Sequence, residues 1–327
     1  MNRRAAALAG VAAAALGLAA CAPPLPTPQP DAVPASVQPA LTTEQIDDVL
    51  ADVSATLGAA DAALTADALD PRVIGPAKTI RGVQYTLAAA GAGTVTAIPP
   101  VAQTIMDPAT DTWPRTVMVI TEAPEDLKAP LLLTLTQDSP REQFKLWSWV
   151  RLFPGVEMPA TAQPEIGSAT VPLDADTVSV PPADVMPRYL DVLASGTASP
   201  HAATFAPDDP LRAAMAGVRA GYSSLLTDKG SLTETYGPID SGPYTIGTAD
   251  GGAIVVAGMQ TVTSITLVDS TLSPTNPAAA LLGKPTVTSS MTITWLSTVA
   301  FGVPPAGSTE PVAVLGAEHV AIQVTGE

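Results

Sequence analysis

The stretch TTEQIDDVLADVSATL, residues 42–57, carries the clearest structural signal in the 327-residue chain. Thr42 and Gln45 fit a capping box, in which the two side chains satisfy backbone groups at a helix N-terminus. Apolar residues then recur at helical spacing, and acidic residues lie off that stripe. The stretch therefore predicts an amphipathic helix that buries the face carrying Ile46, Val49, Leu50, Val53 and Leu57.

Strand-like runs follow a second predicted helix over residues 74–90. They are short, rich in β-branched and aromatic residues, and separated by Pro, Asp and Ser turns. They cover residues 94–98, 101–106, 116–121, 131–136 and 144–153.

The same order restarts after residue 182. Predicted helices over residues 185–194 and 211–226 precede strand-like runs at 244–248, 253–259, 262–268, 286–298 and 318–324. Asp70-Pro71 and Asp209-Pro210 both fit a helix N-cap followed by Pro, and both precede an Arg…Tyr pair. Helices first and antiparallel strands after indicate an α+β class, repeated twice.

The element order of each half resembles that of nuclear-transport-factor-like domains, in which helices pack on the concave face of a curved sheet. The resemblance implies two tandem, cone-like α+β domains. The expected divisions are a leader with its processing site (1–21), a Pro-rich spacer (22–40), a first domain (41–153), a linker (154–182) and a second domain (183–327).

The leader predicts export. Arg3 and Arg4 precede an apolar run that ends in small residues, the pattern of a secretory signal. Leu18, Ala19, Ala20 and Cys21 resemble the lipobox of bacterial lipoproteins. That resemblance implies a diacylglyceryl anchor on Cys21, cleavage before it, and a location on the outer face of the cytoplasmic membrane. The Pro-rich segment after Cys21 is typical of an extended spacer.

The charge balance excludes some partners. The chain has 15 basic and 31 acidic residues, a formal net charge of −16. Such a surface disfavours nucleic acid and anionic lipid headgroups. Two explanations of the acidity stay open, solubility and cation binding. Cys21 is the only cysteine, so disulfides and thiol chemistry are not expected.

No catalytic residue, metal ligand or cofactor motif is predicted. The chain has two histidines, and neither has ligand-like spacing around it. The alternation of Val320, Ile322 and Val324 places His319 on the other, exposed face of a strand. His201 follows Ser-Pro in a turn. The sequence also lacks the H-E-x-x-H, EF-hand and G-x-S-x-G patterns and a complete phosphate-binding loop.

The stretch KLWSWVR, residues 145–151, has two interpretations. Strand alternation puts Trp147, Trp149 and Arg151 on one face. Those rings are expected either to pack in a core or to line a ligand groove.

The stretches TWPRTV (112–117) and MPATA (158–162) resemble uncharacterised actinobacterial lipoproteins. The resemblance implies no catalytic residues. We expect a non-enzymatic envelope protein that binds or scaffolds another envelope component. The alternatives are a carrier of a small apolar ligand in a cone-shaped pocket and an isomerase or hydrolase that uses the same pocket.

Replacing Cys21 by Ser should abolish lipid attachment, because the sulfur that accepts the diacylglyceryl group is lost. Metabolic labelling with a fatty-acid analogue measures this. Equal labelling of the wild type and Cys21→Ser would contradict the assignment.

Overall fold

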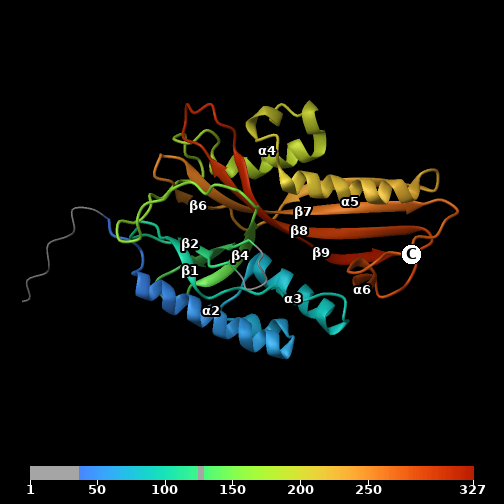
Figure 1. Ribbon diagram of the computed structural model, residues 1–327, viewed down its shortest axis with the longest axis horizontal. Helices are drawn as coiled ribbons and strands as arrows, with labels where there is room; N and C mark the ends of the chain where they lie inside the picture. The colour runs from blue at the N-terminus through green and yellow to red at the C-terminus, as the bar shows by residue number, and fades with distance from the viewer. Residues whose placement is uncertain (1–36, 124–128) are drawn as a thin grey trace, which may run out of the picture. The chain divides into compact units, whose positions relative to one another are not determined.

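Nine strands in the described part of the chain, residues 37–123 and 129–327, form one antiparallel sheet in the computed structural model (Figure 1). The strands are β1 (Ala102–Met106), β2 (Arg115–Thr121), β3 (Leu131–Gln137), β4 (Lys145–Leu152), β5 (Gly230–Pro238), β6 (Tyr244–Gly247), β7 (Ala253–Leu267), β8 (Ser290–Val303) and β9 (Ala313–Gly326). Their order is β1-β2-β3-β4-β9-β8-β7-β5, and β6 pairs with β7 outside this path. The predicted α+β class with antiparallel strands is confirmed.

Helices cover the sheet in two groups. They are α2 (Thr43–Ala63), α3 (Gly75–Ala89), α4 (Pro182–Ser195), α5 (Pro210–Leu226) and α6 (Ala278–Leu282). The predicted capping box is confirmed: the Gln45 amide donates to Thr42 Oγ1 at 3.2 Å, and the Thr42 amide donates to Gln45 Oε1 at 2.9 Å. The predicted apolar stripe is also largely confirmed, because α2 buries Ile46, Leu50 and Val53.

Each helix group has its own hydrophobic core. The α2 and α3 side chains pack on β2, β3 and β4 around Val119, Leu133 and Trp149. The α4 and α5 side chains pack on β7, β8 and β9 around Val255 and Phe301. Alternation along each strand leaves a second set of apolar residues pointing away from these helices.

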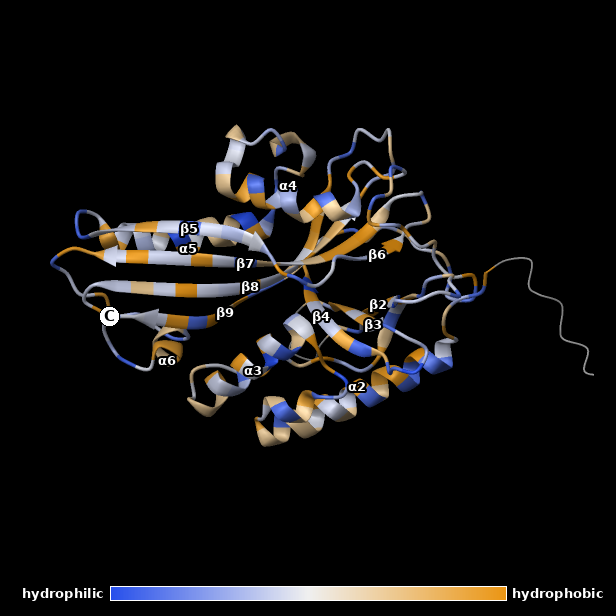
Figure 2. Ribbon diagram, turned by 180° about the vertical axis from the view of Figure 1, so that it is seen from behind, coloured by the Kyte–Doolittle hydropathy of each residue, from blue (hydrophilic) through white to orange (hydrophobic). Residues whose placement is uncertain are grey.

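That second set forms a core shared by the two halves, which we call the central cluster. It joins residues of β1–β4 to residues of β6–β9, and Figure 2 shows hydrophobic residues concentrated in β6 and the adjoining part of β7. Its buried members are Met106, Met118, Ile120, Leu132, Trp147, Val150, Leu152, Ile246, Ile254, Val256, Ala300 and Leu315. The two halves therefore bury apolar surface against each other.

The two halves of the sheet meet at a very short join. β4 and β9 pair only through Arg151 with Ala317 and Leu152 with Gly316. A Cβ atom on Gly316 would lie 2.9 Å from both the carbonyl carbon of Arg151 and the Cα of Leu152, and nearer still to the Arg151 carbonyl oxygen. Only glycine fits this close backbone approach without a shift of β4 or β9.

The predicted two-domain arrangement and cone shape are not confirmed. Residues 37–327 form one compact unit. The proposed linker, residues 154–182, bonds to both halves: the Ser168 amide donates to the Asp107 carbonyl at 2.7 Å, and the Ser179 amide to the Pro304 carbonyl at 2.8 Å. This segment is anchored along its length.

Several predicted elements are wrong in detail. Residues 94–98 form no strand, and the two predicted strands 253–259 and 262–268 are replaced by the single strand β7, which ends at Leu267. Strand β5 was not predicted, because Gly, Ser, Thr and Glu make its sequence polar. Asp209 caps α5 as expected, but α3 begins at Gly75 after Ile74, so Asp70 is not its N-cap.

Gly316→Ala should lower the free energy of unfolding by about 1–3 kcal/mol, because the added methyl group forces β4 and β9 apart. Gly217→Ala is the matched control, since nothing lies within 4 Å of a Cβ at this position in α5. It should raise the stability by about 0.5–1 kcal/mol. Urea titration measures both, and equal stability of the two variants would contradict the account of the join.

Candidate functional site

A polar cluster lies between α5 and the sheet. Arg219 of α5 donates from Nε to Glu234 Oε2 at 2.6 Å and from Nη2 to Tyr236 Oη at 2.7 Å. The Tyr236 hydroxyl in turn donates to Glu234 Oε2 at 2.7 Å. Glu234 and Tyr236 are two residues apart on β5 and so share one face. The Glu234 side chain is 8% exposed, so its charge is stabilised by these bonds.

The cluster continues across β7 and β8. Glu234 Oε1 accepts a hydrogen bond from Thr263 Oγ1 at 3.1 Å, and Trp295 Nε1 donates to the same Thr263 oxygen at 3.2 Å. The Trp295 ring stacks on His319 with centroids 4.7 Å apart and planes at 9°. His319 Nδ1 lies 2.7 Å from Ser297 Oγ.

Burial lowers the pKa of His319 to about 4, although the negative charge of Glu234 opposes the shift. His319 is therefore neutral near pH 7 and cannot donate from both ring nitrogens. Ser297 is fully buried, so the Ser297–His319 pair offers no accessible nucleophile to a substrate. Burial and the bond to Glu234 also raise the pKa of Tyr236.

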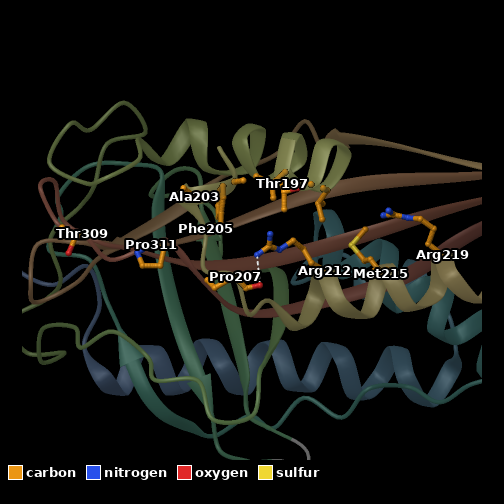
Figure 3. Close-up of a pocket in the computed structure, with 14 residues that line it drawn as sticks. Thr197, Ala203, Phe205, Pro207, Arg212, Met215, Arg219, Thr309 and Pro311 are labelled. Atoms are coloured by element: carbon orange, nitrogen blue, oxygen red, sulfur yellow. Dashed lines mark hydrogen bonds between the residues drawn. The ribbon is translucent and has the colours of Figure 1, made fainter. Parts of the chain in front are cut away.

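A pocket of about 570 Å³ opens beside this cluster (Figure 3). Its walls come from the end of α4, the turns after it, one face of α5 and the β8–β9 loop. The lining residues are Val192, Leu193, Gly196, Thr197, Ala202, Ala203, Phe205, Pro207, Arg212, Met215, Ala216, Arg219, Thr309 and Pro311. The surface is mainly apolar, with two arginines as its charged side chains.

The two arginines share the α5 wall. Arg212, Met215 and Arg219 are three and four residues apart, which places them on one helix face, and Figure 3 shows Met215 between the two guanidinium groups. Neither Asp209 nor Glu234, the carboxylates that pair with them, lines the pocket.

Asp209 fixes the orientation of the Arg212 side chain. Its Oδ2 accepts from the Tyr189 hydroxyl at 2.6 Å and from Arg212 Nε at 3.0 Å, and its Oδ1 accepts the Leu211 and Arg212 amides at 2.9 and 3.2 Å. Arg212 Nη2 also donates to the Ala206 and Pro207 carbonyls. This side chain is held in one orientation at the pocket wall.

Comparison with known proteins gives a family. Residues 37–326 match the family described as a domain of unknown function, DUF8094. The chain belongs to this family. No curated protein and no solved structure matches the chain.

The predicted lipobox of the DUF8094 chain belongs to the part of the sequence that the structure does not describe. Leu18, Ala19, Ala20 and Cys21 lie outside the described residues. Within the described ranges, no helix is long and apolar enough to cross a bilayer, and no group of three or more His, Cys, Asp or Glu side chains is arranged to hold a metal ion.

The predicted common face of Trp147 and Trp149 is wrong. The β3–β4 register shifts at Trp147, so this residue joins the central cluster and Trp149 joins the core under α2 and α3. A bulge of one residue reverses the alternation beyond it. Both rings are 1% exposed, so they line no open groove together. Arg151 Nη1 donates to the Ala129 carbonyl at 2.9 Å.

The predicted exposure of His319 is also wrong. The β8–β9 register shifts at Ile322, so His319 lies with Ala321 and Val324 on the face that α5 covers, whereas Gln323 is exposed. His201 stays in a turn, where its amide donates to Ser199 Oγ at 3.0 Å. Arg219 belongs to the predicted Arg…Tyr pair of the second half, but its partners in the structure, Glu234 and Tyr236, are on β5, a strand that the sequence did not predict.

His319 should make stability depend on pH. Its folded pKa, about 4, lies below the ordinary 6.5, so protonation disfavours the folded state and stability falls as pH drops from 6.5 towards 4. His319→Gln removes this contribution. Urea titrations at about pH 7 and about pH 4.5 should show a smaller stability difference for the variant than for the wild type.

An NMR titration gives an independent check. In a His201→Ala background one imidazole remains, and its ring protons should titrate near pH 4. A midpoint near 6.5, or the same pH dependence of stability in both proteins, would contradict the burial of His319.

Proposed function

We propose that this protein is a lipid-anchored binding protein of the cell envelope, of the actinobacterial lipoprotein type, and that its pocket takes a small, mainly apolar ligand carrying an acidic group. The observation that carries the proposal is the placement of Arg212 and Arg219 on one wall of a mainly apolar pocket with no carboxylate in its lining.

The size and chemistry of the pocket support this ligand class. A volume of about 570 Å³ falls in the usual range for small-molecule sites, which combine apolar walls with a few placed polar groups. Leu193, Ala203 and Met215 offer an apolar wall for a hydrocarbon body. A guanidinium group binds a carboxylate or phosphate through short, charge-assisted hydrogen bonds.

Binding is favoured over catalysis by the state of the titratable groups. Arg219, Glu234 and Tyr236 are bonded to one another, and Ser297 is closed off from solvent. Enzyme sites require a general base or nucleophile within reach of a substrate. The anchor on Cys21 and the Pro-rich spacer would hold such a binding protein near the membrane surface.

Filling the pocket should weaken binding. Ala216 lines the pocket, whereas Ala220, one turn later on α5, does not, and both are exposed. Ala216→Trp should reduce the affinity for anilinonaphthalene sulfonate, a fluorescent apolar anion, by about ten-fold or more, and Ala220→Trp should leave it unchanged. Fluorescence titration of the chain without its leader measures both.

The acidic group is tested separately by competition. Decanoate should displace the fluorescent anion at a concentration about ten-fold lower than decanol, because only decanoate forms charge-assisted bonds with the guanidinium groups. Equal displacement by the two compounds would show that the acidic group contributes nothing to binding, and would restrict the proposal to an apolar ligand. Equal affinity of both Trp variants would contradict binding in this pocket.

A further inference from the structure

An open slot of about 530 Å³ runs along β1, at the opposite edge of the sheet from β5. Every residue of β1, Ala102–Met106, lines one wall, and the continuous segment 158–164 lines the other, with Ile120 between them. We call it the edge slot. Both long walls are stretches of consecutive chain, which suits an extended segment lying between them.

Among the residues that the structure describes, β1 has a strand partner on one side only. It pairs with β2 on one side and is the end of the strand order among the described residues. An edge strand directs a row of N–H and C=O groups away from its neighbour, and such a row is a template for another extended segment. Gln103 and Thr104 are exposed, whereas Met106 is buried in the central cluster.

The slot also has a rigid facing wall. Met158 packs against the central cluster, and the Ala160 carbonyl accepts the Ala249 amide at 2.7 Å. Further along, the Gln163 carbonyl accepts the Ile166 and Gly167 amides within a turn, and the Ser168 amide after this turn donates to the Asp107 carbonyl just after β1 at 2.7 Å. These contacts hold the segment in place beside β1. Binding would therefore cost only the conformational entropy of the incoming strand, because the slot does not have to become ordered first.

The charges of the described segments that line the slot are of one sign. Glu122, Glu157 and Glu165 are exposed at the ends of the lining segments, and residues 101–107, 120–122 and 156–166 contain no Lys or Arg. Glu157 and Glu165 flank the two ends of the facing wall. A segment with a basic residue at each end would complement this arrangement, and like charges would repel an acidic one.

We propose that the edge slot binds an extended segment of another protein, which adds to the sheet as a strand beside β1 and carries Lys or Arg at its ends. Backbone hydrogen bonds to β1 supply the affinity, and small or apolar side chains alternate towards Ile120 and Ala162. The length of β1 corresponds to about 17 Å, enough for some five residues of partner. This site is independent of the α5 pocket.

The test uses the full chain in nanodiscs of neutral phosphatidylcholine, so that the membrane does not attract a basic probe. The probe is a fluorescein-labelled peptide of alternating Val and Thr with Lys at each end. Fluorescence polarisation should show saturable binding below about 1 mM. The same peptide with alternate backbone nitrogens methylated should not bind, because it cannot donate hydrogen bonds to β1.

Two matched substitutions locate the binding site. Thr104→Lys places a cation in the slot and should weaken binding of the Lys-ended peptide by about ten-fold or more. Thr233→Lys makes the same change at an exposed position of β5, the other edge strand, and should leave binding unchanged. The double variant Glu157→Gln, Glu165→Gln should weaken the Lys-ended peptide but not a Ser-ended one.

Four results would overturn the proposal. These are no binding up to about 1 mM, equal binding of the methylated peptide, equal effects of Thr104→Lys and Thr233→Lys, and self-association of the chain that Thr104→Lys abolishes. The last result would assign the slot to a second copy of this chain instead of a basic partner segment.

Discussion

The structure depends on the close approach of β4 and β9 at Gly316. Two residue pairs join the halves of the sheet there, and a side chain at position 316 would collide with the β4 backbone. Because only two residue pairs join them, the strands of the two halves can run in different directions on either side of the join. Their inner faces then bury the central cluster, while helices cover their outer faces.

The location of the α5 pocket follows from this arrangement. With one face of β7 and β8 committed to the central cluster near the join, only the other face is available to α4 and α5. The apolar core under these helices gives way, further along the strands, to the polar cluster of Arg219, Glu234 and His319. The pocket lies where the end of α4 leaves α5, with Arg212 and Arg219 set by bonds to buried carboxylates.

Local signals in the sequence predicted the longer helices α2, α3, α4 and α5 well, but not the short helix α6. The capping box at Thr42, the stripe along α2 and the Asp209 cap of α5 are decided by residues within one or two turns of each other. The α+β class follows from the order of such elements. These features are predictable because few distant residues take part in them.

Features that depend on distant residues were missed. Single-residue bulges at Trp147 and Ile322 reversed the faces of Trp149 and His319, and nothing in the local alternation signals a bulge. Strand β5 is polar because Glu234 and Tyr236 face a cluster supplied by α5 and β7, so its pattern lacks the usual apolar alternation. Because that strand was not predicted, the sequence did not show that Arg219, Glu234 and Tyr236 are neighbours.

The central claim is that the shared central cluster makes residues 37–327 one cooperative unit. Native-state hydrogen exchange tests it most directly, through the amides of Leu133 in β3 and Val256 in β7, which lie on opposite sides of the join. The account predicts that both exchange only through global unfolding, with equal free energies and equal dependence on denaturant. Exchange of Leu133 at a clearly lower free energy than Val256 would show that the first half unfolds independently, and would contradict the account.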